Sequence, residues 1–524
     1  MTWQHTRGIV YARHGLVSTS HPLASSAGLT VLRNGGSVCD AAIAVSAVLC
    51  VVEPSASHLG GDGFAVLFDA ARGETLAANG AGPSPSAGPQ SPQHEERGVG
   101  AFTIPGLVRL WQRLHERYGR LPFASLLADA IELAEEGCPV GRRWARAASS
   151  YLDVLISDPG AREQFLLDGR APAEGAVVRQ QDLAATLQDL ASFGPGDFYD
   201  GRTGQRLVAG LRSLGSAVTE QDLSGFDVAL EPPLGIRYRG FDVCGQPPMS
   251  QGIALLEALG ILEGFELGRL EPGSADLIHL QVEAHKAAFA DRAATLGDGS
   301  DTWKHLLSPS TLADRRRSID PLRASGAGLW PTRAGTDTTS FCIADGDGNA
   351  ISFIQSVFLP WGAAVVAPGL GILMNNRMNG FDPGEGPNAY APGKRPVHTL
   401  NAYLALKNGR VAFLGGTPGG HVQVQTNLQV IQCITDFGMD PQEAAERPRW
   451  AYRTPGWLGR GELTLDLEGK IQPSAVEQLR ARGHPTRTIP PWTHPSAVQV
   501  IRVADDGVMC AGSDPRADGQ AVGW

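Results

Sequence analysis

The chain has 524 residues, which is enough for one very large core or for several domains of ordinary size. Its 44 lysine and arginine residues stand against 54 acidic residues, a formal net charge of −10, and only 19% of residues are charged, compared with about 25% in an average globular protein. We therefore expect no nucleic-acid-binding surface and no membrane-binding surface.

The first residues lack the basic stretch followed by an apolar stretch that marks a secretory signal, so the sequence favours a cytoplasmic protein. The longest apolar run, 41–52, is bounded by Asp40 and Glu53 and is well short of the roughly 20 residues that cross a bilayer. It predicts a buried helix. The seven cysteines form no CxxC pair, which is typical of reduced thiols in a core.

The first half of the chain reads mainly as helix. The pattern predicts a helix from 22 that ends at Gly35, the apolar helix that follows it, and a glycine-rich turn at 58–63 before a buried strand. Loop is expected at 80–97, and a helical layer at 105–225 with helices at 107–118, 123–136 and 180–192. A long helix is expected to begin at Ser274. It carries His279 and Glu283 four residues apart, a spacing that fits a paired surface better than a metal site.

The second half changes character after 326–335, a segment without apolar periodicity that we expect to be exposed. Runs at 338–345 and 349–357 flank a glycine-rich turn and predict a β-hairpin. Further strands are expected at 363–366, 401–406, 411–414 and 498–503, and a helix at 422–437. Strands enclosed by helices on both sides in the sequence predict an α+β fold with a sheet-on-sheet core and helical outer layers.

Motifs for hydride, phosphate and zinc chemistry are missing: the chain has no GxSxG, HExxH or Walker motif and no correctly placed GxGxxG. Thr338 is the residue to single out, because it begins a strand directly after the exposed segment. Two threonines at a strand start, Thr338 and Thr339, are ordinarily only β-formers. A threonine hydroxyl becomes a useful nucleophile when the residue carries a free α-amine as its base, which requires cleavage between Asp337 and Thr338.

Such a nucleophile also needs donors for the oxyanion that forms on the attacked carbonyl. The run Gly415-Gly-Thr-Pro-Gly-Gly420 offers backbone amides that no side chain covers. A plain tight turn explains the same run.

Taken together, these residues resemble the gamma-glutamyltranspeptidase family, a branch of the N-terminal-nucleophile hydrolases. The resemblance covers most of the chain, and its motifs occur in the family's order. They are Asn34-Gly-Gly, Asp40-Ala-Ala, Val52-Glu-Pro, Gly60-Gly-Asp-Gly-Phe64, Ile104-Pro-Gly, Gln246-Pro-Pro, Ser250-Gln-Gly, Thr338-Thr, Asp347-Gly-Asn349 and Gly416-Thr-Pro-Gly-Gly420.

The resemblance implies a four-layer αββα sandwich and a proenzyme that cuts itself before Thr338. The large chain, 1–337, and the small chain, 338–524, would then stay associated as one composite domain, with a homodimer of such heterodimers as one option. By the resemblance Thr338 is the nucleophile, Gly419 and Gly420 supply the oxyanion amides, and Ser356 replaces a threonine whose hydroxyl contacts the nucleophile. No metal or organic cofactor is implied, and the expected partner is a small-molecule amide.

The residues that would bind the substrate depart from the family pattern. Members that transfer glutamyl groups hold the α-amine of the substrate with Asn, Gln and Asp, and the matching positions here are Phe358, Arg377 and Gly380. Arg377 repels an ammonium group and can pair with a carboxylate. A structural salt bridge is an equally good explanation of Arg377.

Three further positions align with residues that bind the glutamyl group in the family. The family's α-carboxylate arginine aligns near Gly88, and its serine pair matches His398 and Thr399. His398 is either a substrate contact or a structural histidine.

We infer an amide hydrolase whose acyl group carries a carboxylate but no α-amine, as in the family's oxamate amidohydrolases and its cephalosporin or glutaryl acylases, with Arg377 as the candidate clamp. Two alternatives stay open. One is a conventional glutathione hydrolase or γ-glutamyltransferase, and the other is an uncleaved, non-catalytic binding paralogue. Whether the acyl group passes to water or to an acceptor amine is not encoded in these motifs.

Overall fold

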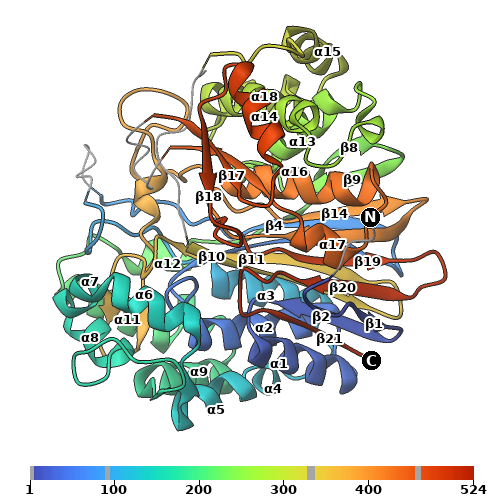
Figure 1. Ribbon diagram of the computed structural model, residues 1–524. Coiled ribbons are helices and arrows are strands. Elements are labelled where there is room, and N and C mark those ends of the chain that lie inside the picture. The colour runs from blue at the N-terminus through green and yellow to red at the C-terminus, as the bar shows by residue number, and fades with distance from the viewer. Residues whose placement is uncertain (1–4, 89–94, 327–336, 455–461) are drawn as a thin grey trace.

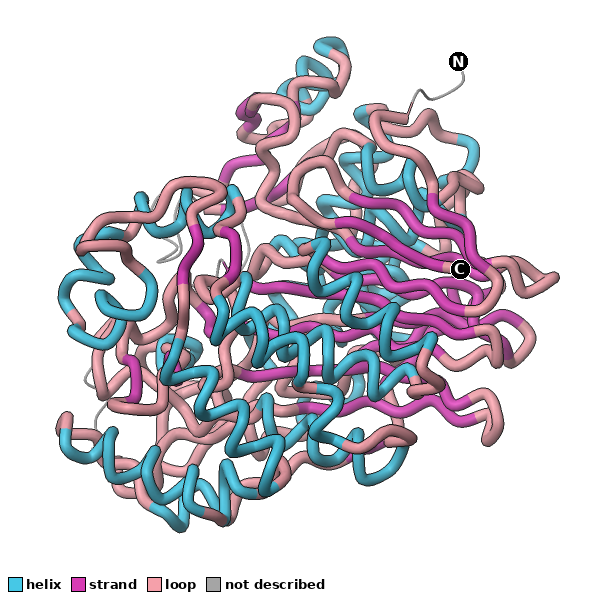
Figure 2. Tube along the Cα trace, turned by 90° about the horizontal axis from the view of Figure 1, so that it is seen from below, coloured by secondary structure: helices cyan, strands magenta, loops and turns pink. Residues whose placement is uncertain are grey.

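The computed structural model describes residues 5–88, 95–326, 337–454 and 462–524. Two seven-stranded sheets lie face to face, and helices cover the outer face of each, which gives four layers (Figure 1). Viewed from below, the helices of one outer layer lie across the strands of the sheet behind them (Figure 2). The αββα sandwich expected from the sequence is confirmed.

The two sheets contain most of the strands. In spatial order, the first sheet consists of β1 (Val10–Ala12), β20 (Met509–Ser513), β19 (Gln499–Val503), β15 (Arg410–Gly416), β14 (Tyr403–Lys407), β9 (Phe241–Gly245) and β8 (Leu234–Tyr238). The second consists of β21 (Gln520–Gly523), β2 (Gly15–Thr19), β10 (Asp337–Asp345), β11 (Ala350–Phe358), β3 (Asp62–Asp69), β4 (Glu74–Asn79) and β7 (Leu230–Glu231). Smaller sheets pair β5 (Cys138–Pro139) with β6 (Val177–Val178), β12 (Val366–Ala367) with β13 (Ile372–Leu373), and β16 (Trp450–Arg453) with β17 (Thr464–Glu468) and β18 (Thr486–Ile489).

Helices from the first half of the chain cover mainly the second sheet. They are α1 (Pro22–Arg33), α2 (Val38–Val52), α3 (Leu107–Tyr118), α4 (Phe123–Leu126), α5 (Ala128–Glu136), α6 (Arg142–Ser150), α7 (Leu152–Ser157), α8 (Pro159–Phe165), α9 (Gln181–Phe193), α10 (Asp197–Asp200), α11 (Arg202–Ser213) and α12 (Glu220–Ser224). The other layer contains α13 (Gly252–Leu262), α14 (Ala275–Thr295), α15 (Pro309–Ser318), α16 (Val422–Thr435), α17 (Pro441–Glu446) and α18 (Pro473–Ala481), with short 3-10 helices at η1 (Leu267–Arg269) and η2 (Thr302–His305). A third 3-10 helix, η3 (Arg377–Gly380), contacts the first part of the chain, where the N–H of Met378 donates to the carbonyl oxygen of Ala101.

Strand β10 shows how the layers are held together. Successive side chains of a strand point to opposite faces, so a strand buried on both sides can be apolar throughout. Phe341 and Ile343 pack toward the helices, whereas Cys342 and Ala344 pack between the two sheets. Every residue of β10 except the last is buried, which fixes its register strongly.

The predicted hairpin, the apolar helix and the helix that begins after Ser274 are confirmed. The expected strand at 363–366 is largely a turn, because Gly362 and Ala364 adopt positive φ angles of 50° and 54°. His279 and Glu283 were expected at the surface, but both are buried. The segment expected to be exposed, 326–335, lies outside the described residues except for its first member.

The seven cysteines are all free, as expected, and five of them are buried. Within the part of the chain that is described, no helix is long and apolar enough to cross a membrane.

Candidate active site

The predicted nucleophile lies beside the peptide bond that precedes it. Thr338 is 1% exposed, and its Oγ1 is 2.7 Å from the carbonyl oxygen of Asp337. That carbonyl oxygen also accepts a hydrogen bond of 2.8 Å from the hydroxyl of Ser356, which lies 3.2 Å from Thr338 Oγ1. The contact expected between Thr338 and Ser356 is therefore present in the uncut chain.

The pairing of β10 with β11 produces this arrangement. Asp337 is opposite Phe358, and an irregularity between Asp337 and Thr339 shifts the register at the nucleophile. The backbone N–H of Phe358 donates to Ser356 Oγ at 2.8 Å, which orients the hydroxyl toward Asp337. Phe358 has a φ of 85°, a strained conformation for a residue with a side chain, so the surrounding structure must enforce it.

Arg143, on α6, contacts both sides of the same peptide bond. One Nη atom pairs with the carboxylate of Asp337 and donates to the carbonyl oxygen of Thr338 at 2.8 Å. Its other Nη atom is 3.2 Å from Glu53, the acid of the Val52-Glu-Pro motif. Glu53 in turn accepts a hydrogen bond of 2.9 Å from Ser20. The segment around the predicted cleavage point is thus attached to α6 and, through Arg143, to Glu53 at the end of α2.

The predicted oxyanion loop follows β15 and leads into α16. Gly419 and Gly420 adopt φ angles of 124° and 59°, which glycine tolerates best. A Cβ atom on Gly419 would lie 2.4 Å from the carbonyl oxygen of Pro495, so the close approach also requires glycine. Among the described residues, neither backbone N–H donates to an acceptor. Both amides remain available for an oxyanion.

Gln251, from the Ser250-Gln-Gly motif, connects this loop to the predicted substrate residues. Its side-chain amide donates to the carbonyl oxygens of Thr399 at 2.6 Å and of Gly420 at 3.0 Å. Because one amide group serves both carbonyls, Thr399 and Gly420 are held next to each other.

Arg377 is completely buried, and its contacts fit both a structural salt bridge and a clamp for a substrate carboxylate. Its Nε donates to Asp62 at 3.1 Å, which is a structural ion pair, whereas neither Nη atom has a partner among the described residues. The guanidinium lies 4.7 Å from the centre of the Phe358 ring. Burial raises the pKa of Asp62 to about 6, although Arg377 opposes that shift. The unpartnered half of the guanidinium matches the geometry of a carboxylate.

A small cavity of about 20 Å³ lies beside these residues. Phe358 and Thr399, which we expected to contact substrate, line it together with Gly380 and with Arg292 from α14, whereas Arg377 and His398 do not. Arg292 was not identified from the sequence.

His398 is buried and its ring lies 4.8 Å from that of Phe64. Burial lowers its pKa well below the usual value, so the ring is neutral at pH 7. Neither ring nitrogen has a hydrogen-bond partner among the described residues, which leaves His398 free to contact a substrate. Gly88, the position aligned with the family's arginine, packs close to Tyr390: a Cβ atom there would lie 2.7 Å from the tyrosine hydroxyl oxygen.

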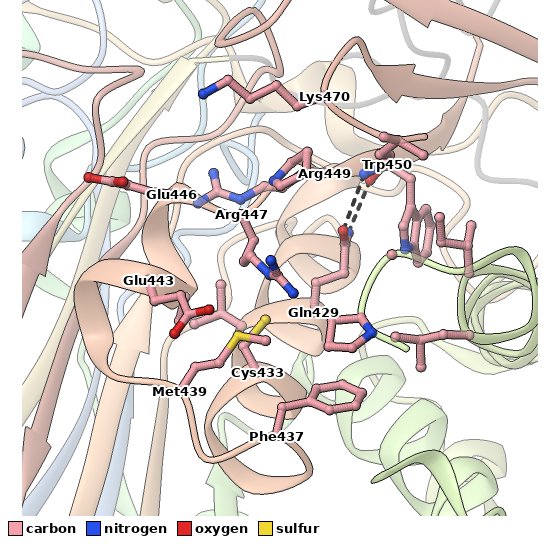
Figure 3. A pocket seen from close by; sticks show the side chains of 18 of the residues that line it. Gln429, Cys433, Phe437, Met439, Glu443, Glu446, Arg447, Arg449, Trp450 and Lys470 are labelled. Carbon is pink, nitrogen blue, oxygen red and sulfur yellow. Dashed lines mark hydrogen bonds between the residues drawn. The ribbon is translucent and has the colours of Figure 1, made fainter. Parts of the chain in front are cut away.

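A much larger cavity, about 890 Å³, lies elsewhere, between α14, α16 and the loop before β16 (Figure 3). Gln429, Cys433 and Trp450 are on its wall, and none of the predicted site residues lines it. Size alone therefore does not identify the reacting centre.

His279 and Glu283 do meet a third potential metal ligand, His484. Their atoms are already engaged, because His279 contacts His484 at 2.8 Å and Glu283 pairs with Lys286 at 2.8 Å. Lys286 already supplies the positive charge that balances Glu283, so we interpret this cluster as a structural network.

Sequence reasoning missed Arg143, Arg292, Gln251 and the pairing of Asp62 with Arg377. Gln251 and Asp62 lie inside motifs that carried the family resemblance, and that was the available signal. Arg143 and Arg292 stand alone in helices, where an arginine is ordinarily a solvated residue.

A profile of the Gamma-glutamyltranspeptidase family matches residues 24–524. The chain is 35% identical to the "Glutathione hydrolase-like YwrD proenzyme" of Bacillus subtilis (strain 168), with 97% of this chain and 98% of the relative covered. It is also 35% identical to the "Oxamate amidohydrolase proenzyme" of Klebsiella pneumoniae subsp. pneumoniae, with 98% of each covered. The crystal structure of cephalosporin acylase from Bacillus halodurans superposes with a TM-score of 0.90 at 33% identity, covering 100% of this chain and 98% of that one.

A buried ion-pair network of Arg449, Asp514 and Arg516 lies next to the predicted oxyanion loop. Arg449 donates to Asp514 at 2.7 Å and to Ser496 at 2.6 Å, close to Ala497, whose N–H donates to Thr417 in the loop. Burial alone would raise the pKa of Asp514, but Arg449 and Arg516 outweigh it and hold the pKa below its usual value.

We expect Asp514→Asn to lower the free energy of unfolding by about 3 kcal/mol, because it leaves buried arginines without their counter-charge. Since the folded-state pKa of Asp514 is depressed, its contribution is present above the unfolded-state pKa of about 3.9 and is lost as the pH falls through the folded-state value. Urea unfolding between pH 3 and pH 7 measures both effects. The exposed Asp505→Asn is the matched control and should change stability by no more than about 0.5 kcal/mol. Equal midpoints for the two variants would contradict the role given to Asp514.

Proposed function

The chain belongs to the gamma-glutamyltranspeptidase family and acts on amide C–N bonds, and on that premise we propose a proenzyme that cuts itself before Thr338 and then hydrolyses small amides through that threonine. The observation that carries the proposal is the position of Thr338 Oγ1, 2.7 Å from the carbonyl oxygen of the bond to be cut.

Self-cleavage uses groups that are already in contact. Thr338 Oγ attacks the carbonyl carbon of Asp337, and the hydroxyl of Ser356 donates to the carbonyl oxygen as negative charge develops on it. The C–N bond then breaks and the nitrogen takes up the proton lost by the threonine hydroxyl, leaving an ester between Asp337 and Thr338. Water hydrolyses that ester, which releases the carboxylate of Asp337 and the free hydroxyl and amine of Thr338.

The two pieces, 1–337 and 338–524, are proposed to remain one composite domain. In the second sheet β10 pairs with β2 and β11 pairs with β3, so strands of the large chain flank the hairpin of the small chain on both sides. Separating the pieces would expose both strand edges and the apolar faces buried on them.

In the turnover of a substrate, the new α-amine of Thr338 removes the proton from its own hydroxyl as Oγ attacks the amide carbonyl. The amides of Gly419 and Gly420 stabilise the oxyanion, the amine leaves, and an acyl-enzyme ester remains. Water attacks this ester in the same geometry and regenerates Thr338.

Arg377 and Phe358 support an acyl group with a carboxylate and without an α-amine. Neither Nη atom of Arg377 has a partner among the described residues. The side chain of Phe358 has no hydrogen-bond acceptor, so it cannot bind an ammonium group by a hydrogen bond. Diacid monoamides satisfy this description. Among the relatives, one is named an oxamate amidohydrolase and a structural neighbour a cephalosporin acylase.

A second candidate is glutathione hydrolysis or γ-glutamyl transfer, favoured by the relative named glutathione hydrolase-like. The γ-glutamyl group carries an α-amine in addition to its carboxylate. Arg377 has hydrogen-bond donors only, so its two unpartnered Nη atoms offer that ammonium no acceptor.

Arg143→Ala is expected to slow self-cleavage by about tenfold or more, because the bond before Thr338 loses the group that fixes the Asp337 carboxylate and the Thr338 carbonyl. Gel electrophoresis of samples taken during refolding or cell-free synthesis measures the rate. Arg142→Ala is the matched control, since Arg142 is on the same helix and its ion pair is with Asp518 near the surface. Equal cleavage rates in the two variants would show that Arg143 does not position the bond.

The processed enzyme is expected to hydrolyse glutaryl anilide with a kcat/KM about 10-fold or more above that for γ-glutamyl anilide, because only the latter carries an ammonium group. Spectrophotometric release of the aniline measures both, with oxamate hydrolysis followed as ammonia. A preference for γ-glutamyl anilide would favour the second candidate.

Arg377→Ala should raise KM for glutaryl anilide by about 10-fold or more and leave KM for the neutral hexanoyl anilide within about 2-fold, because it removes a charged hydrogen-bond donor. Asp62→Asn is the comparison, since it removes the ion pair and keeps the arginine. If Arg377 serves only the ion pair, both variants will affect the acidic and the neutral substrate alike.

A further inference from the structure

The carboxylate of Asp337 contacts the nitrogen of the peptide bond that precedes Thr338. Its Oδ1 accepts the N–H of Thr338 at 3.2 Å, and the same oxygen pairs with a terminal nitrogen of Arg143. Asp337 is 8% exposed, so both contacts are largely shielded from bulk solvent. A carboxylate oxygen can accept more than one hydrogen bond. Arg143 therefore fixes the carboxylate without displacing it from the nitrogen.

The groups around this carboxylate leave an excess of negative charge. Among the described residues Arg143 alone forms an ion pair with it, and Arg143 is shared with Glu53. Burial lowers the pKa of the nearby His21, so its ring is mainly neutral at pH 7 and adds no second positive charge. Asp518, which accepts the backbone N–H of Arg143 at 3.4 Å, is paired with Arg142. Two carboxylates therefore share one guanidinium beside the peptide nitrogen.

The nitrogen changes character during the proposed cleavage. A peptide nitrogen is barely basic, but it becomes an amine when Thr338 Oγ adds to the carbonyl carbon of Asp337. As the Oγ–C bond forms, the nitrogen takes up the proton that leaves the threonine hydroxyl, and the C–N bond then breaks. The departing nitrogen carries positive charge at that moment. A negative charge 3.2 Å away favours this charged form and lowers the barrier to its departure.

We infer that Asp337 is a catalytic residue of self-cleavage, and that its carboxylate stabilises the ammonium group that forms on the Thr338 nitrogen. This inference rests on the proposed self-cleavage and adds the group that serves the leaving nitrogen, whereas Ser356 serves the carbonyl oxygen. Asp337 neither gains nor loses a proton overall. The peptide link that places its carboxylate on the nitrogen is lost when the bond breaks, so the assistance serves one cut only.

The test compares Asp337→Asn with Asp518→Asn. The first keeps an oxygen that can accept the N–H of Thr338 but removes the charge, and the second removes a nearby charge that is paired with Arg142. Asp337→Asn should slow self-cleavage by about 10-fold or more, because a neighbouring opposite charge changes such a protonation equilibrium by about that factor. Asp518→Asn should stay within about 2-fold. Gel electrophoresis after cell-free synthesis measures the rates, and intact mass locates the cut.

Two further measurements separate this role from simple anchoring through Arg143. In an Arg143→Ala background the ion pair is already lost, so a residue that only anchors would add nothing. We expect Asp337→Asn to slow cleavage there by a further factor of about three or more. Hydroxylamine cleaves an ester but not an amide. It should not restore the rate of Asp337→Asn, because the charge acts before the ester forms.

The outcomes separate this inference from the proposed function. An unmodified rate for Asp337→Asn, no further slowing in the Arg143→Ala background, or a rate restored by hydroxylamine overturns the inference while the amide hydrolase stands. An unmodified chain that is never cut refutes self-cleavage and the inference together. Should Asp337→Asn not fold by circular dichroism, Asp337→Glu and Asp337→Ser decide. The glutamate variant keeps the charge and should be cut faster by a factor of about three or more, and equal rates overturn the inference.

Discussion

The site depends on one constraint, the pairing of the first residues of β10 with the last residues of β11. That pairing places Asp337 opposite Phe358 and brings the hydroxyl of Ser356 to the carbonyl that Thr338 faces. Because β10 is buried on both faces and flanked by strands on both edges, a slip by one residue would exchange the large side chains that face the helices, Phe341 and Ile343, with the small ones that face the other sheet. The same packing that stabilises the core therefore fixes the position of the nucleophile.

Buried charge divides the surroundings of the nucleophile into two regions. On the side of the cleavage point, Arg143 pairs with both Glu53 and Asp337, so the peptide bond is held by one cationic and two acidic side chains. Near the predicted substrate residues, Arg377 is paired with Asp62 through Nε, and neither of its Nη atoms has a partner within the described ranges. The first cluster is suited to positioning a bond, and the unpartnered Nη atoms of Arg377 are suited to binding a carboxylate.

Local patterns were sufficient to predict the layers, the central hairpin and the apolar helix. Hydrophobic periodicity indicates which faces are buried, and glycine-rich segments indicate where turns lie. Thr338 and the glycine loop were found through motifs that the fold requires: Gly419 must approach Pro495 closely, and only glycine permits it. Arg143 could not be predicted, since its importance comes from partners far away in the sequence, Glu53 and Asp337. The same reason explains the error over His279 and Glu283, whose spacing indicates a shared helix face but not whether that face is buried.

The intact mass of the purified protein beside that of a Thr338→Ala variant tests the central claim most directly. The account predicts two polypeptides, 1–337 and 338–524, whose masses sum to the full chain plus one water, and an uncut variant. A single uncut chain in both samples, under conditions where the protein is folded, would contradict self-cleavage at Thr338 and would favour a binding protein that retains the fold of an enzyme.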